Sequence, residues 1–281
     1  MLARRAARIP ALLIAAVVLV VVVAVGCTAK GDVTPGAPVG TGDGGAELLV
    51  LGAASLSDVL DDLARAFGDA YPGLQVVVST DGSDALRARI EEGVTADVFV
   101  SADTANPDRV ARAGLSLGAP VVVATSSIVV AVAPQRRDDI RSPAHLADPG
   151  VRIVAAGRGV PISAYAQEAV ERLAALDGYP ADFADRVAAN IVSREDNVRA
   201  ALAKVMLGEG DAAFVYATDV IGLDDLGVLE LPPEAAVEAE YAAVALSAAR
   251  EPGLARDFVA WLGTPPARAI LAAAGFGPVL P

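Results

Sequence analysis

Short apolar runs alternate with amphipathic stretches along most of the chain, and this alternation predicts an α/β fold. Residues 48–51 form a continuous apolar run, typical of a buried strand, whereas residues 57–70 carry apolar side chains at helical spacing. The same two patterns predict further strands at residues 75–79, 97–101, 151–155, 190–193 and 212–216, and further helices at 84–92, 163–173, 195–207, 252–262 and 264–274. Another helix is expected to start at residues 106–107. Repeated strand–helix–strand units favour right-handed crossovers and a mostly parallel sheet with helices on both faces.

A long apolar and β-branched run at residues 121–133 is interrupted by the small and hydroxyl-bearing residues 124–127. We interpret it as two strands separated by a crossing between two lobes. The chain is expected to return near residues 231–233 and 240–241. The predicted organisation is one lobe at residues 47–126 and 234–281, a second lobe at residues 127–233, and a hinge with an interlobe ligand cleft.

The N-terminus has the layout of a bacterial secretory signal. Arg4, Arg5 and Arg8 precede an apolar run at residues 11–25, and Cys27 comes directly after the small residues that end this run. Cys27 is the only cysteine in the chain, so it has no partner for an intramolecular disulfide. A lipid-modified N-terminal cysteine is the interpretation that gives it a role.

We therefore expect residues 1–26 to be a lipoprotein signal peptide. Residues 27–46 are expected to be the lipidated Cys27 and a flexible tether, because the segment is rich in Gly, Thr, Pro and Asp and cannot bury a core. An uncleaved membrane anchor is the alternative, because the apolar run falls only slightly short of the length that spans a bilayer. Either anchor places the protein at the cell membrane, on its extracytoplasmic face.

The chain is strongly acidic, which restricts its partners. The formal net charge is −13, and loss of residues 1–26 removes three arginines and no acid, which leaves −16. Such a charge disfavours binding to nucleic acid. It also excludes long-range attraction of an anionic ligand, so an anion site must depend on short-range donors such as helix N-termini.

Two serine-containing turns follow predicted strands and open predicted helices. Ser55 lies in the turn at residues 52–58, and Ser83 lies in the turn at residues 79–86. Helix N-termini present unpaired backbone N–H groups, and ligands of open α/β sheets bind beyond the carboxyl ends of the strands. The turns therefore predict a site for a small oxyanion, although either serine alone is more often a helix cap.

Three fragments of the predicted second lobe occupy matching positions. Ile162 and Val198 lie near the starts of predicted helices, where backbone N–H groups can bind an oxyanion, and Tyr216 ends a predicted strand. The Tyr216 hydroxyl can donate into a cleft, although a buried tyrosine bonded to a neighbouring carbonyl is an alternative. Ser55 and Ser83 together with these three positions form a far more specific set than any member alone.

In order along the chain, these segments resemble the motifs of the periplasmic molybdate-binding proteins of bacterial ABC transporters. Residues 53–58, Ala-Ala-Ser-Leu-Ser-Asp, resemble an Ala-Ala-Ser-Leu-Thr-Asp segment of the family, and residues 96–103 match its Ala-Asp-Val-Phe-Ala-Ser-Ala-Asp stretch. The other similar segments are Gly82-Ser83, Val160-Pro161, Asn197-Val198-Arg199 and Val215-Tyr216. The resemblance extends from residue 47 to the C-terminus.

This resemblance implies a type II periplasmic-binding-protein fold, in which two α/β lobes close on a tetrahedral oxyanion, either molybdate or tungstate. It implies ligand contacts from the hydroxyl and backbone donors of Ser55 and Ser83, the backbone N–H groups of Ile162 and Val198, and the hydroxyl of Tyr216. It also implies delivery of the ligand to an ABC permease and its ATPase, and we expect the protein to be a monomer. Molybdenum would be bound as its oxyanion, with no cofactor and no catalysis.

Departures from the family pattern occur next to these positions. Ile162-Ser163 stands where relatives have a small residue and glycine, so Ser163 could supply an extra donor. Asp81 and Asp84 flank Ser83, and a carboxylate turned toward a dianion would repel it. Phosphate can keep a proton, whereas molybdate, tungstate and sulfate are deprotonated, so such a carboxylate would favour phosphate. Phosphate is therefore one alternative ligand. Sulfate and thiosulfate are further alternatives.

Two other classes of function are disfavoured. An enzyme with a serine nucleophile needs a nearby base, and His145, the only histidine, lies at a predicted helix start after a turn. Asp61 and Asp62 are adjacent and point in different directions on a helix, unlike a catalytic pair. A non-catalytic envelope scaffold is expected to expose aromatic anchors, whereas aromatic residues make up 4% of the chain and Trp261 has the spacing of a core residue.

Overall fold

The structure of the protein is a computed structural model that describes residues 45–279. The predicted signal peptide, Cys27 and most of the predicted tether lie outside the described residues. Within the described part of the chain, none of the helices combines the length and the apolar character that crossing a membrane requires.

Strands and α-helices alternate along the described chain. The strands are β1 (Glu47–Ala53), β2 (Gln75–Asp81), β3 (Val98–Ser101), β4 (Val121–Val132), β5 (Ile153–Ala156), β6 (Ile191–Glu195), β7 (Ala212–Tyr216), β8 (Gly227–Glu230) and β9 (Glu238–Ala245). The α-helices are α1 (Ser57–Ala70), α2 (Ser83–Glu91), α3 (Ala105–Arg112), α4 (Pro161–Ala174), α5 (Phe183–Ala189), α6 (Val198–Met206), α7 (Pro252–Leu262) and α8 (Pro265–Ala273). The strands and helices predicted by apolar periodicity are present within a few residues of their expected bounds, whereas α5, β8 and β9 were not predicted.

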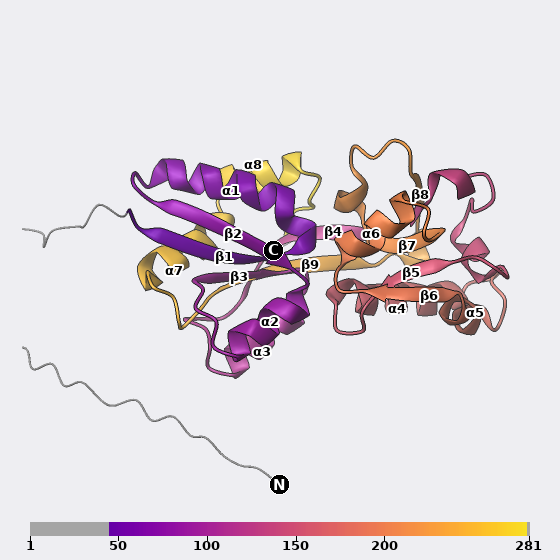
Figure 1. Cartoon of the computed structure of the whole chain (residues 1–281), viewed down its shortest axis with the longest axis horizontal. Coiled ribbons are helices and arrows are strands. Elements are labelled where there is room, and N and C mark those ends of the chain that lie inside the picture. Colours follow the sequence, from indigo (N-terminus) through magenta and orange to yellow (C-terminus); the bar gives the residue numbers. More distant parts are fainter. Residues whose placement is uncertain (1–44, 280–281) are drawn as a thin grey trace, which may run out of the picture. The chain divides into compact units, whose positions relative to one another are not determined.

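Two α/β lobes are built on one continuous path of paired strands. The strand order is β2-β1-β3-β9-β4-β7-β5-β6, with β8 also paired to β4. The first lobe contains β1, β2, β3 and β9, with α1 and α8 on one face and α2 and α3 on the other (Figure 1). The second lobe contains β5, β6, β7 and β8, with α6 on one side and α4 and α5 on the other (Figure 1). This layering explains the alternating apolar pattern of the sequence.

β4 is one continuous strand that belongs to both lobes, so the prediction of two strands broken at residues 124–127 is wrong. Residues 121–127 of β4 pair with β9, and residues 128–132 pair with β7 and β8. Thr125 and Ser126 do not interrupt the strand because both pair with residues of β9, and the ladder adjusts by a register shift between Val122 and Ala124. The chain thus crosses between the lobes inside a strand.

The sheet is mixed, so the prediction of a mostly parallel sheet is also wrong. β1 pairs in parallel with β2 and β3, and β5 pairs in parallel with β6 and β7. The pairs of β9 with β3 and β4, and of β4 with β7 and β8, are antiparallel. The antiparallel pairs arise because β4 carries the chain into the second lobe and β9 brings it back.

Aromatic side chains fix the helices that cover the first lobe. Phe67 of α1 is fully buried, and its ring centre lies 5.0 Å from that of Phe258 in α7, edge to face. The Trp261 ring lies 5.4 Å from Phe67. Trp261 therefore packs against the core as its spacing predicts. Such pairs contribute about 0.5–1.5 kcal/mol beyond the apolar area that they bury.

Candidate functional site

Ser55 and Ser83 lie at one edge of the sheet in the first lobe. β1 and β2 are parallel, with Ala53 opposite Asp81, so the turns that follow these strands begin at the same level. Ser55 lies in η1 (Ala54–Leu56), a short 3₁₀ turn that leads into α1, and Ser83 is the first residue of α2. Both serines are buried, with 4% and 1% of their surface exposed. The structure thus places both predicted residues beyond the carboxyl ends of neighbouring strands.

Both serine hydroxyls accept a hydrogen bond from the protein. The Tyr241 hydroxyl donates to Ser55 Oγ at 3.2 Å, and the backbone N–H of Ala102 donates to Ser83 Oγ at 3.1 Å. For neither hydroxyl hydrogen is an acceptor found among the described residues. Each serine is therefore held in place by one bond and can still donate another.

Ile162 and Val198 lie in the first turns of α4 and α6, and both are buried. N–H groups in a first turn have no preceding helical carbonyl to bond, and no other acceptor for these two is found within residues 45–279. No side chain caps α4, whereas the Asn197 side chain accepts the N–H of Ala200 at the start of α6. Both helix starts therefore present backbone donors without a protein acceptor.

Ser163 was predicted as a possible extra donor, and the structure shows that this is wrong. Its hydroxyl lies 2.9 Å from the carbonyl oxygen of Ala156 and 2.7 Å from that of Gly157. Donation to these carbonyls turns the side chain back toward its own lobe. The hydroxyl therefore stabilises the turn before α4 instead of serving a ligand.

Tyr216 ends β7 and is 1% exposed. No side-chain hydrogen bond from Tyr216 to the turn that follows it is found within residues 45–279, so its phenolic hydrogen remains available to donate. Burial, and after it the nearby Tyr241 and Tyr165, raise the pKa of Tyr216 well above its usual value. The hydroxyl therefore stays protonated and acts as a donor near neutral pH.

Tyr241 of β9 connects predicted residues of the two lobes. Besides donating to Ser55, it packs its ring against that of Tyr216, with ring centres 5.5 Å apart. Burial raises the pKa of Tyr241 well above its usual value, so it also remains a donor. No local signal in the sequence marks Tyr241 as a site residue, because its contact with Ser55 spans 186 residues.

The turn before Ser83 also touches the turn before Val198. A Cβ atom at Gly82 would lie 2.6 Å from the carbonyl oxygen of Asp196, which is closer than real Cβ atoms approach. Glycine is therefore required for this contact between the lobes. Because η1 also packs against α6, the starts of η1, α2 and α6 meet in one place.

The two aspartates beside Ser83 differ in their surroundings. Asp81 accepts the backbone N–H of Gly82 at 2.8 Å and pairs with Arg89 at 2.5 Å, so its charge is neutralised locally. Asp84 instead faces the second lobe, where a Cβ atom on Gly159 would lie 2.6 Å from its Oδ2. Of the two carboxylates, only that of Asp84 is turned toward the junction of the lobes.

Arg199 forms an ion pair that joins the lobes. Its guanidinium lies 2.9 Å from Asp58 of α1 in the first lobe and 3.2 Å from Asp219 in the second. The Arg199 Nε and Asp219 Oδ1 atoms are not aligned for a hydrogen bond, so this contact is electrostatic. The three residues were not predicted as a cluster, because Asp58 and Arg199 are 141 residues apart.

Asp219 is buried beside the predicted donor Tyr216. Its carboxylate accepts the backbone N–H of Tyr216 at 3.3 Å. Burial raises the pKa of Asp219 to about 7, and Arg199 and the Tyr216 N–H offset only part of this rise. The Asp219 carboxyl therefore gains or loses its negative charge near neutral pH, and its attraction to Arg199 changes with it.

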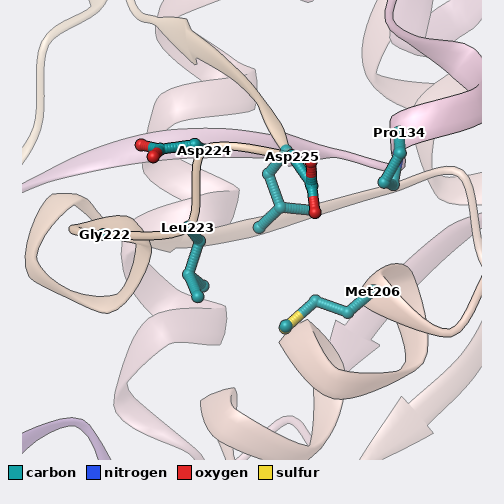
Figure 2. A pocket seen from close by; sticks show the side chains of 7 residues that line it. Pro134, Met206, Gly222, Leu223, Asp224 and Asp225 are labelled. Carbon is teal, nitrogen blue, oxygen red and sulfur yellow. The ribbon is translucent and has the colours of Figure 1, made fainter.

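A separate surface hollow of about 410 Å³ lies in the second lobe and contains none of the five predicted residues. In Figure 2, the side chains of Leu223 and Met206 extend into the same space, below Asp224 and Asp225. Exposed carboxylates at its rim are unfavourable for an oxyanion. The buried donors at the lobe junction remain the better candidate site.

The protein has two α/β lobes linked by crossing strands, and helix starts and hydroxyl groups meet where the lobes touch. This arrangement is the type II periplasmic-binding-protein fold. The family model for bacterial extracellular solute-binding proteins matches residues 48–277. The chain belongs to this family.

Three named proteins illustrate the similarity. The molybdate-binding protein ModA of Mycobacterium tuberculosis is 34% identical over 253 residues, which cover 89% of this chain and 92% of that protein. The periplasmic molybdate-binding protein of Azotobacter vinelandii has a TM-score of 0.67 at 25% identity, over 83% of this chain and 99% of that one. The sulfate-binding protein SubI of M. tuberculosis has a TM-score of 0.74 at 19% identity, over 84% of this chain and 88% of that one, which shows a shared fold.

Asp219 predicts a measurable pH dependence of stability. Its pKa is raised from 3.8 to about 7, so between these values the folded state holds a proton that the unfolded state has lost, and stability falls as pH rises. The variant Asp219→Asn keeps an acceptor for the Tyr216 N–H and removes this titration. Urea unfolding between pH 4 and 8 is expected to show a flatter profile than that of the parent protein.

The matched control for this experiment is Asp225→Asn, which removes an exposed carboxylate from the same lobe. Its unfolding profile is expected to follow that of the parent protein. Superimposable profiles for the parent protein and Asp219→Asn would contradict the raised pKa.

Proposed function

We propose that the protein captures molybdate or tungstate between its two lobes and delivers it to an ABC importer. Relatives and structural neighbours that are named as molybdate-binding proteins support this ligand. Delivery implies a membrane permease and its ATPase as partners, and the ligand enters no reaction on the protein. The role is thus that of a binding protein without a cofactor.

The chemistry of the donor set carries this proposal. All the proposed donors are neutral and belong to buried residues. They are the hydroxyl groups of Ser55, Ser83 and Tyr216 and the backbone N–H groups of Ile162 and Val198. Molybdate and tungstate are fully deprotonated near neutral pH and therefore need donors only. Hydrogen bonds to a charged group contribute about 1.5–3 kcal/mol each, so a few such donors bind a dianion without a cationic side chain.

We also propose that residues 47–126 and 234–281 form one lobe and residues 127–233 the other, with a hinge where the chain crosses. The change in partners of β4 between Ser127 and Ile128, from β9 to β7 and β8, lies one residue from the proposed boundary and supports this division. In this arrangement Ser55 and Ser83 bind from one lobe, and Ile162, Val198 and Tyr216 from the other. Closing of the lobes would surround the ligand.

Sulfate is the second candidate ligand, because it is also deprotonated and tetrahedral. The same donors suit it, and the fold is shared with a sulfate-binding protein. The difference between the two anions is one of size, so the width of the closed cleft decides between them. Calorimetry can therefore separate the two candidates directly.

Isothermal titration of the purified protein is expected to show tight binding of molybdate and tungstate and much weaker binding of sulfate and phosphate. A gain in thermal stability with molybdate should accompany it by mass action. Tight binding of phosphate or sulfate without heat from molybdate would refute the proposed ligand. A protein that gains no stability with any oxyanion would instead be consistent with a scaffold.

The double variant Ser83→Ala and Tyr216→Phe removes one proposed donor from each lobe. Loss of two hydrogen bonds to a charged ligand is expected to cost about 3–6 kcal/mol, which raises the Kd for molybdate more than a hundredfold. Ser116→Ala with Tyr179→Phe is the matched control, because it removes the same two hydroxyl groups elsewhere. An unchanged Kd in the first pair would show that the site is placed wrongly.

We further propose that the protein is a monomeric lipoprotein, anchored through Cys27 on the extracytoplasmic face of the cell membrane. The basic segment, the apolar run and the small residues before Cys27 support this anchor. Membership of the extracellular solute-binding family supports the location. A tether at residues 28–46 would let the lobes reach the permease.

Fatty-acid labelling in a bacterial host tests the anchor. The parent protein is expected to incorporate labelled fatty acid and to begin at Cys27, whereas Cys27→Ser should incorporate none. Thr28→Ala is the neighbouring control and should be labelled like the parent. A parent protein that is unlabelled and begins at Met1 would indicate an uncleaved anchor instead.

A further inference from the structure

Asp84 directly follows Ser83, and its carboxylate lies against the opposite lobe. It occupies the first turn of α2, whereas Gly159 lies in the turn that leads into α4. A Cβ atom on Gly159 would lie 2.6 Å from Asp84 Oδ2 and 3.3 Å from the carboxyl carbon. The absence of a side chain at Gly159 therefore makes room for the carboxylate between the lobes.

One oxygen of this carboxylate is buried without a hydrogen-bond donor. Asp84 Oδ1 is shielded from solvent, and no partner for it is found among residues 45–279. A buried acceptor of this kind is costly unless something donates to it. The protein itself leaves this position unsatisfied, which points to a group supplied from outside the chain.

The arginines of α2 do not neutralise Asp84. Arg87 pairs with Glu91 at 2.5 Å, and Arg89 pairs with Asp81 at 2.5 Å. Within the described part of the chain no ion pair includes Asp84. Its negative charge therefore acts directly on any anion that binds beside it.

Two of the proposed ligand donors flank this carboxylate. Ser83 precedes Asp84 in α2, and the N–H of Ile162 belongs to the uncapped start of α4, three residues after Gly159. An oxyanion that contacts both donors would lie close to the carboxylate. Like charges repel strongly at short range where water is excluded, so a fully deprotonated oxyanion is disfavoured, whereas an oxyanion that keeps a hydrogen can donate it to Oδ1.

We infer that Asp84 is a specificity-determining residue of the binding site. It lowers the affinity for fully deprotonated oxyanions such as molybdate, tungstate and sulfate, and it raises the relative affinity for oxyanions that keep a hydrogen, such as phosphate. This inference rests on the proposed function, because it needs an oxyanion between Ser83 and Ile162. It names the side chain that tunes the choice among such ligands.

The test is calorimetry of molybdate and of inorganic phosphate with the parent protein, Asp84→Ser and Asp84→Asn. Both variants remove the charge, and serine also offers a small donor that fits the first turn of a helix. The Kd for molybdate is expected to fall at least tenfold in both. In Asp84→Ser the Kd for phosphate should stay the same or rise, so the preference for molybdate over phosphate increases at least tenfold.

The matched control is Asp81→Asn, which removes the other carboxylate beside Ser83. Arg89 already neutralises Asp81, so the preference for molybdate over phosphate should change less than threefold. An equal change in Asp81→Asn and Asp84→Ser would show a general effect of net charge and would overturn the inference. Thermal unfolding without ligand checks that each variant is folded.

The outcomes separate this inference from the proposed function. If the parent protein binds molybdate and neither Asp84 variant differs from it, Asp84 has no role in specificity and the proposed function stands. If the parent protein and both variants bind no oxyanion, the proposed function and the inference both fail. If molybdate binds measurably only after Asp84 is replaced, the inference is supported and the parent protein serves a ligand that keeps a hydrogen.

Discussion

Buried backbone N–H groups without a protein acceptor are the constraint on which the candidate site depends. A buried donor that is left unpaired costs about as much free energy as a lost hydrogen bond, and the starts of α4 and α6 each leave such a donor at the junction of the lobes. No side chain caps α2 or α4, so residues 45–279 offer no internal substitute. These donors are therefore available to the acceptor from solution that we propose.

Charged and neutral groups have separate roles at this junction. Arg199 is engaged by Asp58 of the first lobe and Asp219 of the second, so this cation holds the lobes together. Ser55, Tyr216 and Tyr241 are uncharged and buried, and the raised pKa values of the tyrosines keep them protonated. A strongly acidic protein can bind an anion in this way, because its donors act over the length of one helical turn.

The sequence predicts the local features of this site and misses its long-range ones. Apolar periodicity and turn residues locate Ser55, Ser83 and Tyr216 at strand and helix ends, because those signals depend on neighbouring residues. The same rules read residues 124–127 as a break, since they cannot show that β9 would pair with this part of β4. The Tyr241–Ser55 contact depends on the return of β9 to the first lobe, 186 residues after Ser55. The direction of Asp84 depends on how the lobes meet. No local pattern contains either.

The sharing of β4 has a consequence for how such a protein can be taken apart. Residues 121–127 complete the sheet of one lobe, and residues 128–132 complete the sheet of the other, without a loop between them. Any cut that separates the lobes at this point must therefore pass through the middle of a strand whose two halves are both hydrogen-bonded. The second lobe is bounded by β4 on one side and by the return of the chain through β9 on the other, so it is not a module that can be transplanted by a single cut.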